Sequence, residues 1–441
     1  MQSFKFLSAA RFARSLAFLG FTALAAALPA QPDANPPEKP SPPKIEKQIM
    51  IFPDSVVREQ WLHTLKLVNA PQDLKLLNPG QCIRLGVIAT GDDRDSYLEN
   101  TKLSFRVEFA GKSQEHPLAP LAAIKQIKPE GGDFVNAMLN SINVQSPNMS
   151  MASLGASAGN WCVPDNAQDG TATIEAEIES PAGHQKQKSV QIQIESFETG
   201  SKRTFKDDGE YEEFTMSYHY QPNPARLFPA LQFFAADTKY RSQTGALETA
   251  AASLGAALKA DPAAAQDFMA RVAAQTGFTR AFGLLVLLNG GYDIEPVLKT
   301  MSEEDRERFA NHPVFPDPFD FSHVEDIGTR LDMLWSIFTS TGQFAPMQKI
   351  ASALAWRSDW ENFDKARKSP NPPKEWTPEI GRAVGYGAAG WALGSFQRTD
   401  PLAADYIEFL AASPDTPDGV KAELKVLQTD PAFKWQWGNK K

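Results

Sequence analysis

The apolar residues of this chain change their spacing once, near residue 222, and this change limits the possible folds more than any other feature. Before it, apolar and polar residues alternate, most clearly in residues 171–179 (TATIEAEIE) and 189–195 (SVQIQIE). Such alternation is typical of half-buried antiparallel strands. After it, apolar residues recur at helical spacing, as in residues 244–260. The sequence therefore predicts a β domain over 47–222 and an all-α domain over 223–441.

The β domain is predicted to contain two hairpins. Strands are expected at residues 47–52, 81–90, 102–109, 171–179 and 189–195. A Pro-Ala-Gly-His segment separates the last two and predicts the first hairpin. The tight-turn dipeptide Asp208-Gly209 predicts a second, which would join 202–206 to 210–220. Residues 111–160 fit the alternation poorly, and we expect them to form a long inserted loop.

The last part of the β domain resembles a known fold. Residues 168–177 (QDGTATIEAE), the Pro-Ala-Gly turn and residues 190–194 (VQIQI) look like the closing hairpin of bacterial immunoglobulin-like domains. The resemblance implies an immunoglobulin-like antiparallel β-sandwich. It does not extend to antibody-type domains, because Cys162 precedes Asp169-Gly170, whereas those domains place their second cysteine after that turn.

The α domain is predicted to consist of unequal helical hairpins. Helices are expected at 244–260, 263–275, 278–288, 302–311, 325–339, 346–355, 378–396, 401–412 and 417–427. Three Asp-Pro pairs, at Asp261, Asp400 and Asp430, should each cap a helix, because Asp suits the N-cap and Pro suits the first helical position. Their irregular spacing favours a solenoid-like domain over a regular repeat array.

A second resemblance lies within the α domain. Residues 330–342 (RLDMLWSIFTSTG), followed by Met347, Ile350 and Leu354, are similar to a signature of the form LDxLWxxFxxTGxxxxxxxIxxAL. That signature belongs to a family of exported bacterial proteins with no assigned function. The resemblance covers about residues 254–354 and supports a helical domain. From its residues, the motif is expected to form a helical hairpin in which Thr341-Gly342 breaks the chain. It implies no activity.

The first 30 residues have the layout of a secretory signal peptide. Lys5, Arg11 and Arg14 form a basic start, an apolar run follows, and Pro29-Ala30 closes it. The alternative is an uncleaved membrane anchor, although the run is short for a membrane span. Residues 31–46 are rich in proline and are predicted to be a linker. We therefore expect an exported, periplasmic or extracellular protein with no membrane span once the leader is removed.

The predicted export determines how the two cysteines are interpreted. Cys82 and Cys162 would meet an oxidising compartment, where disulfides persist, so they are predicted to form one bridge. The alternative is a pair of buried thiols too far apart to bond. The formal net charge of −9 argues against a nucleic-acid partner, because nucleic-acid binding needs clustered cations.

Two clusters are candidate metal sites, one of aspartates alone and one of histidines and acidic residues. Asp92, Asp93 and Asp95 share one turn and offer the oxygen ligands that Ca²⁺ prefers, although a solvated turn has the same sequence. The second cluster lies in the loop at 312–326 (HPVFPDPFDFSHVED). Its members are His312, Asp317, Asp320, His323, Glu325 and Asp326. Two imidazoles and several carboxylates are suitable ligands, but the spacing matches no known ligand pattern, and the prolines favour an extended strap.

Residues 155–159 (GASAG) match the G-x-S-x-G motif of serine hydrolases, which would make Ser157 a nucleophile. That motif works between a strand and a helix, and the residues after Gly159 do not favour a helix. We therefore interpret this segment as a flexible loop of small residues.

Seven of the nine tryptophans follow residue 330. Trp335 and Trp391 are predicted to be core residues of helical hairpins. Trp356, Trp360 and Trp376 flank a polar, proline-rich segment and are candidates for a binding groove, because tryptophan is a frequent interface anchor.

These observations favour an exported non-enzymatic protein that binds a protein partner or acts as a scaffold in the cell envelope. The sequence predicts no cofactor and no small-molecule ligand. The alternative is a hydrolase or metal-dependent enzyme that uses the loop at 312–326. Convergence of at least three of its histidine and acidic side chains would favour the enzyme.

Overall fold

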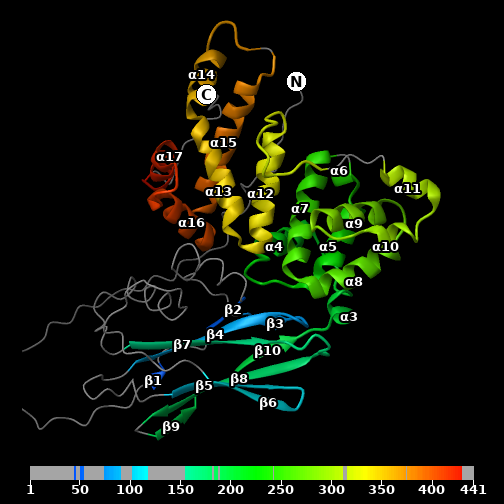
Figure 1. Ribbon diagram of the computed structural model, residues 1–441, viewed down its shortest axis with the longest axis vertical. Helices are drawn as coiled ribbons and strands as arrows, with labels where there is room; N and C mark the ends of the chain where they lie inside the picture. The colour runs from blue at the N-terminus through cyan, green and yellow to red at the C-terminus, as the bar shows by residue number, and fades with distance from the viewer. Residues whose placement is uncertain are drawn as a thin grey trace, which may run out of the picture. The chain divides into compact units, whose positions relative to one another are not determined.

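A β region precedes a helical region in the computed structural model (Figure 1). The structure describes residues 44–45, 50–53, 74–90, 102–117, 154–180, 183–186, 189–241, 243–310, 315–373 and 375–429. Among the described residues, strands occur up to residue 194 and helices from residue 197, so the predicted order of the two regions is confirmed. The predicted signal peptide lies outside the described residues, as does the linker up to residue 43. None of the helices in the described part is long and apolar enough to cross a membrane.

The first sheet is built around one long strand, β4 (Cys82–Thr90). Antiparallel β7 (Leu154–Cys162) pairs with β4 over its whole length, with Cys82 opposite Cys162. Two short strands, β1 (Lys44–Ile45) and β2 (Met50–Pro53), pair with the other edge of β4.

The second sheet has the order β3-β10-β8-β5-β6, and β9 also pairs with β8. Its strands are β3 (Leu76–Leu77), β5 (Lys102–Phe109), β6 (Lys112–Pro117), β8 (Gly170–Ser180), β9 (Gly183–Lys186) and β10 (Val190–Ile194). The pairs are antiparallel except for β3 and β10, which run parallel. Antiparallel pairing of β8 with β10 confirms the first predicted hairpin partners, with β9 inserted between them.

The two sheets contribute to one apolar core. Alternate residues of β8, Ala172 and Ile174 among them, are fully buried, as the period-2 pattern predicts. Ile83 and Trp161 of the first sheet lie in the same buried cluster as Ile174 of the second. The prediction of a loop over 111–160 is wrong at both ends, since 112–117 and 154–160 belong to strands. Residues 118–153 lie outside the described part.

The second predicted hairpin is wrong, because residues 208–217 form helix α4 (Asp208–Ser217) after the short α3 (Phe197–Gly200). Asp207 accepts a hydrogen bond from the amide of Glu210 at 2.9 Å, and the Glu210 carboxylate accepts one from the amide of Lys206 at 3.0 Å. This exchange is close to a capping box, in which side chains at both ends of the first turn satisfy free amides. The acidic residues beside Gly209 therefore favour a helix start over a tight turn.

The predicted helices are all present. The described helices after α4 are η3 (Pro224–Arg226), α5 (Leu227–Ala236), α6 (Thr238–Arg241), α7 (Thr244–Ala260), α8 (Pro262–Ala273), α9 (Gly277–Asn289), α10 (Glu295–Leu298), α11 (Glu303–Ala310), α12 (Ile327–Thr341), α13 (Phe344–Ser352), η4 (Ala353–Trp356), α14 (Arg357–Arg367), α15 (Pro378–Phe396), α16 (Pro401–Ala412) and α17 (Asp418–Thr429). Asp261 and Asp400 cap α8 and α16, as predicted. Asp430 lies outside the described residues.

Two apolar cores lie within the helical region, and α12 contacts elements of both. One core gathers around α5, α7 and α9, and the other around α12, α13, α15 and α16. The hydroxyls of Ser253 on α7 and Ser340 on α12 lie 2.8 Å apart and join the two sets of helices. Gly342 ends α12 with φ of 66°, a left-handed conformation that glycine adopts without strain. The chain then returns as α13, which confirms the predicted hairpin.

Candidate functional site

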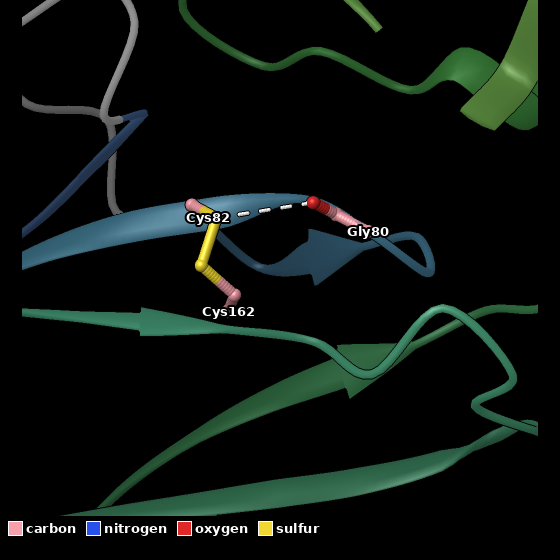
Figure 2. The surroundings of a disulfide bond; sticks show 3 residues. All are labelled: Gly80, Cys82 and Cys162. Carbon is pink, nitrogen blue, oxygen red and sulfur yellow. Dashed lines mark hydrogen bonds between the residues drawn. A yellow bond between two sulfur atoms is a disulfide. The ribbon is translucent and has the colours of Figure 1, made fainter. Parts of the chain in front are cut away.

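The disulfide between Cys82 and Cys162 is formed, as predicted (Figure 2). The two residues face each other on neighbouring strands, β4 and β7, and are separated by 80 positions in sequence. The bridge therefore lies within one sheet. This arrangement differs from the antibody pattern, in which the bridge links two sheets.

Two acidic residues of the strap at 312–326, Asp317 and Asp320, accept hydrogen bonds from the strap's own backbone. The side chains of Asp317 and Asp320 accept hydrogen bonds from the amides of Phe319 and Ser322, at 2.9 and 2.8 Å. Their carbonyl oxygens both accept from Nη1 of the buried Arg330, each at 2.6 Å. These contacts fold the strap into turns and tie it to α12.

The described residues contain no group of three or more His, Cys, Asp or Glu side chains that could hold a metal ion. His323 and Glu325 are exposed, and His312 lies outside the described residues, as do Asp92, Asp93 and Asp95. No observation on the described strap therefore favours the metal-dependent alternative.

Ser157 lies within strand β7, opposite Val87 of β4. A nucleophilic serine of the G-x-S-x-G type needs a strand-to-helix turn, and this position offers none. The interpretation of residues 155–159 as a loop is also wrong. Pairing with β4 along the whole strand satisfies the backbone there, so small residues do not prevent a strand.

The candidate groove tryptophans separate into two environments. Trp356 and Trp360 are half-buried and face α15: Trp356 lies over Gly385, and its ring is 5.6 Å from that of Phe321. Trp360 packs 6.2 Å from the ring of Tyr386. Trp376 is 52% exposed.

Of the two predicted core tryptophans, Trp335 is buried and confirms the prediction, whereas Trp391 is 45% exposed and shows it to be wrong. Trp335 stacks on Phe396 with ring centroids 3.4 Å apart. Trp391 lies on the opposite side of α15 from the buried Ala389 and Leu393. Helical spacing of apolar residues on α15 therefore does not distinguish its core side from its outer side.

The outer side of α15 carries the exposed Trp391 and four partly buried apolar residues, of which Ala388 also packs against the core. The five residues are Ile380, Val384, Ala388, Trp391 and Ala392, which we call the α15 outer face. Their spacing places them on one side of the helix, and each is at least partly exposed. The face extends over about 18 Å and carries no charged residue. Trp376 immediately precedes the N-cap of α15, Thr377.

The inner side of α15 is fixed by buried contacts. The Tyr386 hydroxyl donates to the buried carboxylate of Glu423 on α17 at 2.6 Å. Gly381 approaches the Val324 carbonyl so closely that a Cβ there would lie 2.8 Å from it. The helix is therefore rigidly held from behind, and the outer face is a preformed surface. An exposed tryptophan on a helix fixed in this way is a candidate interface anchor.

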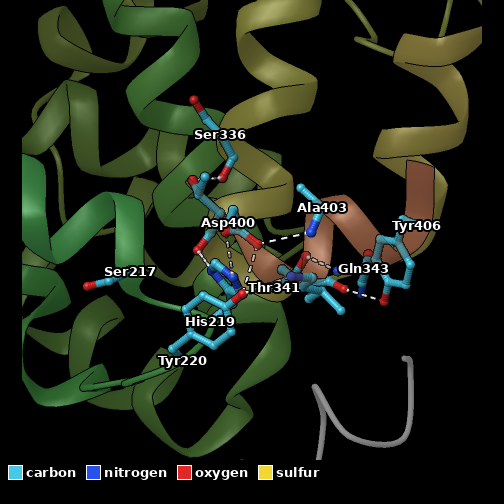
Figure 3. A network of polar contacts seen from close by, with 12 residues as sticks. Ser217, His219, Tyr220, Ser336, Thr341, Gln343, Asp400, Ala403 and Tyr406 are labelled. Atoms are coloured by element: carbon cyan, nitrogen blue, oxygen red, sulfur yellow. Dashed lines mark hydrogen bonds and ion pairs between the residues drawn. The ribbon is translucent and has the colours of Figure 1, made fainter. Parts of the chain in front are cut away.

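Sequence reasoning missed a buried polar network at the other end of α15 (Figure 3). His219 and Asp400 are 1% and 8% exposed, and His219 Nε2 lies 3.2 Å from Asp400 Oδ2. His219 Nδ1 lies 2.8 Å from the carbonyl oxygen of Thr339. The network thus joins the turn after α4, the end of α12 and the start of α16.

Further hydrogen bonds hold the second oxygen of the Asp400 carboxylate. Tyr220 OH donates to Asp400 Oδ1 at 2.8 Å, and the Ala403 amide donates to the same atom at 3.0 Å. Tyr220 OH also accepts from the Leu402 amide at 3.1 Å. Burial alone would raise the pKa of Asp400, but the contact with His219 and these hydrogen bonds lower it instead. No sequence signal links His219 to Asp400, because 181 positions separate them.

The pKa of Asp261 is raised and the pKa of Asp400 is lowered. We therefore predict that the effect of Asp261→Asn on stability depends on pH. Burial raises the pKa of Asp261 to about 6. A carboxyl group with a raised pKa binds its proton more tightly in the folded state, so wild-type stability falls as pH rises from about 4 to 6. Asn keeps the cap without the charge. Above pH 7 the variant should be more stable by on the order of 2 kcal/mol.

Urea unfolding of wild type and Asp261→Asn at pH 4 and pH 8 measures this difference. The two proteins should converge at pH 4, where the carboxyl group is neutral. The matched control is Asp400→Asn, which should destabilise at pH 8 because the pKa of Asp400 is lowered. A difference between wild type and Asp261→Asn that stays constant over this range would contradict the prediction.

Comparison of the chain with protein-family models and with curated proteins found no match. The candidate functional site is therefore the α15 outer face, chosen on its geometry and exposure.

Proposed function

We propose that this is an exported, non-enzymatic scaffold protein of the cell envelope that binds a protein partner through the α15 outer face. One observation carries the proposal: an uncharged apolar helix face ends in the exposed Trp391 and begins beside the exposed Trp376. Tryptophan side chains supply much of the binding energy at protein interfaces. A rigid helix presenting them loses little conformational entropy when it binds.

The export half of the proposal rests on the leader-like residues 1–30 and on the cysteines. Disulfides persist in the periplasm and outside the cell, and are rare in the bacterial cytosol. The formed bridge between Cys82 and Cys162 supports a periplasmic or extracellular location. The signature-like segment that begins at Arg330 supports membership in the exported family that carries it.

We also propose that the β region is an immunoglobulin-like sandwich. Two observations support it: both sheets bury side chains in one core, and the pairs of β8 with its neighbours are antiparallel. Within such a fold, the sandwich would act as a stable module that carries the helical region in the envelope.

The partner-binding proposal is tested by photo-crosslinking of the full chain in the envelope. A photoreactive amino acid is placed at Trp391, at Trp376, or at Asn362, an exposed polar position on α14. We expect one discrete protein adduct from positions 391 and 376 and none from 362. The charge-bearing substitution Val384→Glu should reduce the adduct at least tenfold, because a buried charge disfavours the complex.

Two results would contradict the proposal. The first is an adduct of equal yield from position 362. The second is a Val384→Glu variant that keeps its adduct while remaining as stable as wild type. Val384 is half-buried, so the free energy of unfolding of the variant is measured alongside the adduct to separate lost binding from lost stability.

A further inference from the structure

Both ring nitrogens of His219 face hydrogen-bond acceptors. The Thr339 carbonyl oxygen, 2.8 Å from Nδ1, can only accept, so Nδ1 must carry a hydrogen. The Asp400 carboxylate lies 3.2 Å from Nε2. Nε2 is buried and makes no hydrogen bond to another described residue. A neutral imidazole with hydrogen on Nδ1 would therefore point a lone pair at an ionised carboxylate.

That arrangement would be costly, because two buried acceptors facing each other satisfy neither. One additional proton between Nε2 and Oδ2 removes the conflict. The other carboxylate oxygen already accepts from Tyr220 OH and the Ala403 amide, and these bonds stabilise the negative charge on Asp400. The additional proton therefore belongs on the ring, which becomes an imidazolium.

We propose that His219 and Asp400 form a buried imidazolium–carboxylate pair that acts as a latch. It fastens the turn at 218–220 to the end of α12 and the start of α16 (Figure 3). The latch is independent of partner binding by the α15 outer face, and it goes beyond that proposed function.

The groups described around the pair are two tyrosines of the turn, uncharged residues of α12 and residues at the start of α16. The turn contributes Tyr218 and Tyr220, and burial raises the pKa of both hydroxyls, so they stay neutral. At the contact, α12 contributes the uncharged Phe338 and Thr339. From α16 come Asp400, Asp405, which raises the pKa of Tyr220, and Tyr406, whose hydroxyl donates to the Gly342 carbonyl at 2.8 Å.

The latch predicts a loss of stability in acid. On the acid side the contribution of Asp400 is lost as pH falls below the ordinary aspartate range, because its pKa is lowered in the folded state.

Asp400→Asn is the matched variant. Asn still caps α16 and accepts through Oδ1, and its amide can donate to Nε2 of a neutral ring. The variant thus keeps the hydrogen bonds and removes the charge. The latch predicts two ring N–H groups on His219 in wild type at pH 7, and one in Asp400→Asn.

Nitrogen-15 NMR of the histidine rings in the full chain counts these protons. The chain has six histidines, and the His219 signals are those absent from His219→Gln. A single ring N–H on His219 in wild type at pH 7 overturns the proposal. The wild-type count decides the question even if Asp400→Asn does not fold.

Discussion

Replacing Gly255 by alanine is expected to destabilise the helical region by about 3 kcal/mol, the upper part of the range for overpacked sites. Gly255 lies on α7 where that helix meets the end of α9. A Cβ there would lie 2.8 Å from both the Gly290 nitrogen and the Val286 carbonyl oxygen. Both are backbone atoms, so the helices must separate to admit a methyl group. Urea unfolding at pH 7 measures the loss.

The matched control is Gly328→Ala on α12, where a Cβ would meet no atom within 4 Å. There alanine should stabilise by up to about 1 kcal/mol, because glycine loses more backbone freedom when it enters a helix. The two substitutions are chemically identical and should have opposite signs. If Gly255→Ala were neutral or stabilising, the close approach of α7 to α9 would be wrong.

The sequence predicted most helices because their apolar periodicity and their caps agree. Asp400-Pro401 marks the start of α16, and Gly342 marks the end of α12, as the pattern indicated. The prediction of a hairpin joining 202–206 to 210–220 was wrong because Asp208-Gly209 was interpreted as a tight turn. The reciprocal bonds of Asp207 and Glu210 at the first turn of that helix decide the outcome instead.

The candidate site was less predictable, because burial depends on which helices pack together. Trp335 and Trp391 both occur in apolar helical segments, yet one is buried and the other is exposed. Only tertiary packing separates the inner and outer sides of an apolar helix such as α15. The contact between His219 and Asp400 was also not predictable from the sequence. Asp400 has the pattern of an ordinary helix cap, and no sequence pattern marks His219.

Removing the disulfide is expected to be the largest change in stability. The bridge closes a loop with a sequence separation of 80. In the chain-entropy model, a loop of that length contributes about 4 kcal/mol, because it restricts the unfolded chain. The double variant Cys82→Ala/Cys162→Ala should lose this amount relative to oxidised wild type. Reductant should lower wild-type stability to the same level and leave the variant unchanged.

The oxidation state of the same two cysteines also indicates the compartment in which the chain folds. Pairing of β4 with β7 brings Cys82 opposite Cys162, so the two sulfurs meet wherever the sheet forms, but they stay bonded only in an oxidising compartment. Thiol alkylation in intact cells should therefore fail on the full chain until reductant is added. A chain without residues 1–30, retained in the cytosol, should be alkylated at both positions. Alkylation of the full chain without reductant would contradict export, whereas a double variant as stable as oxidised wild type would contradict the stabilising role alone. The two measurements separate the location of the protein from the energetics of its sheet.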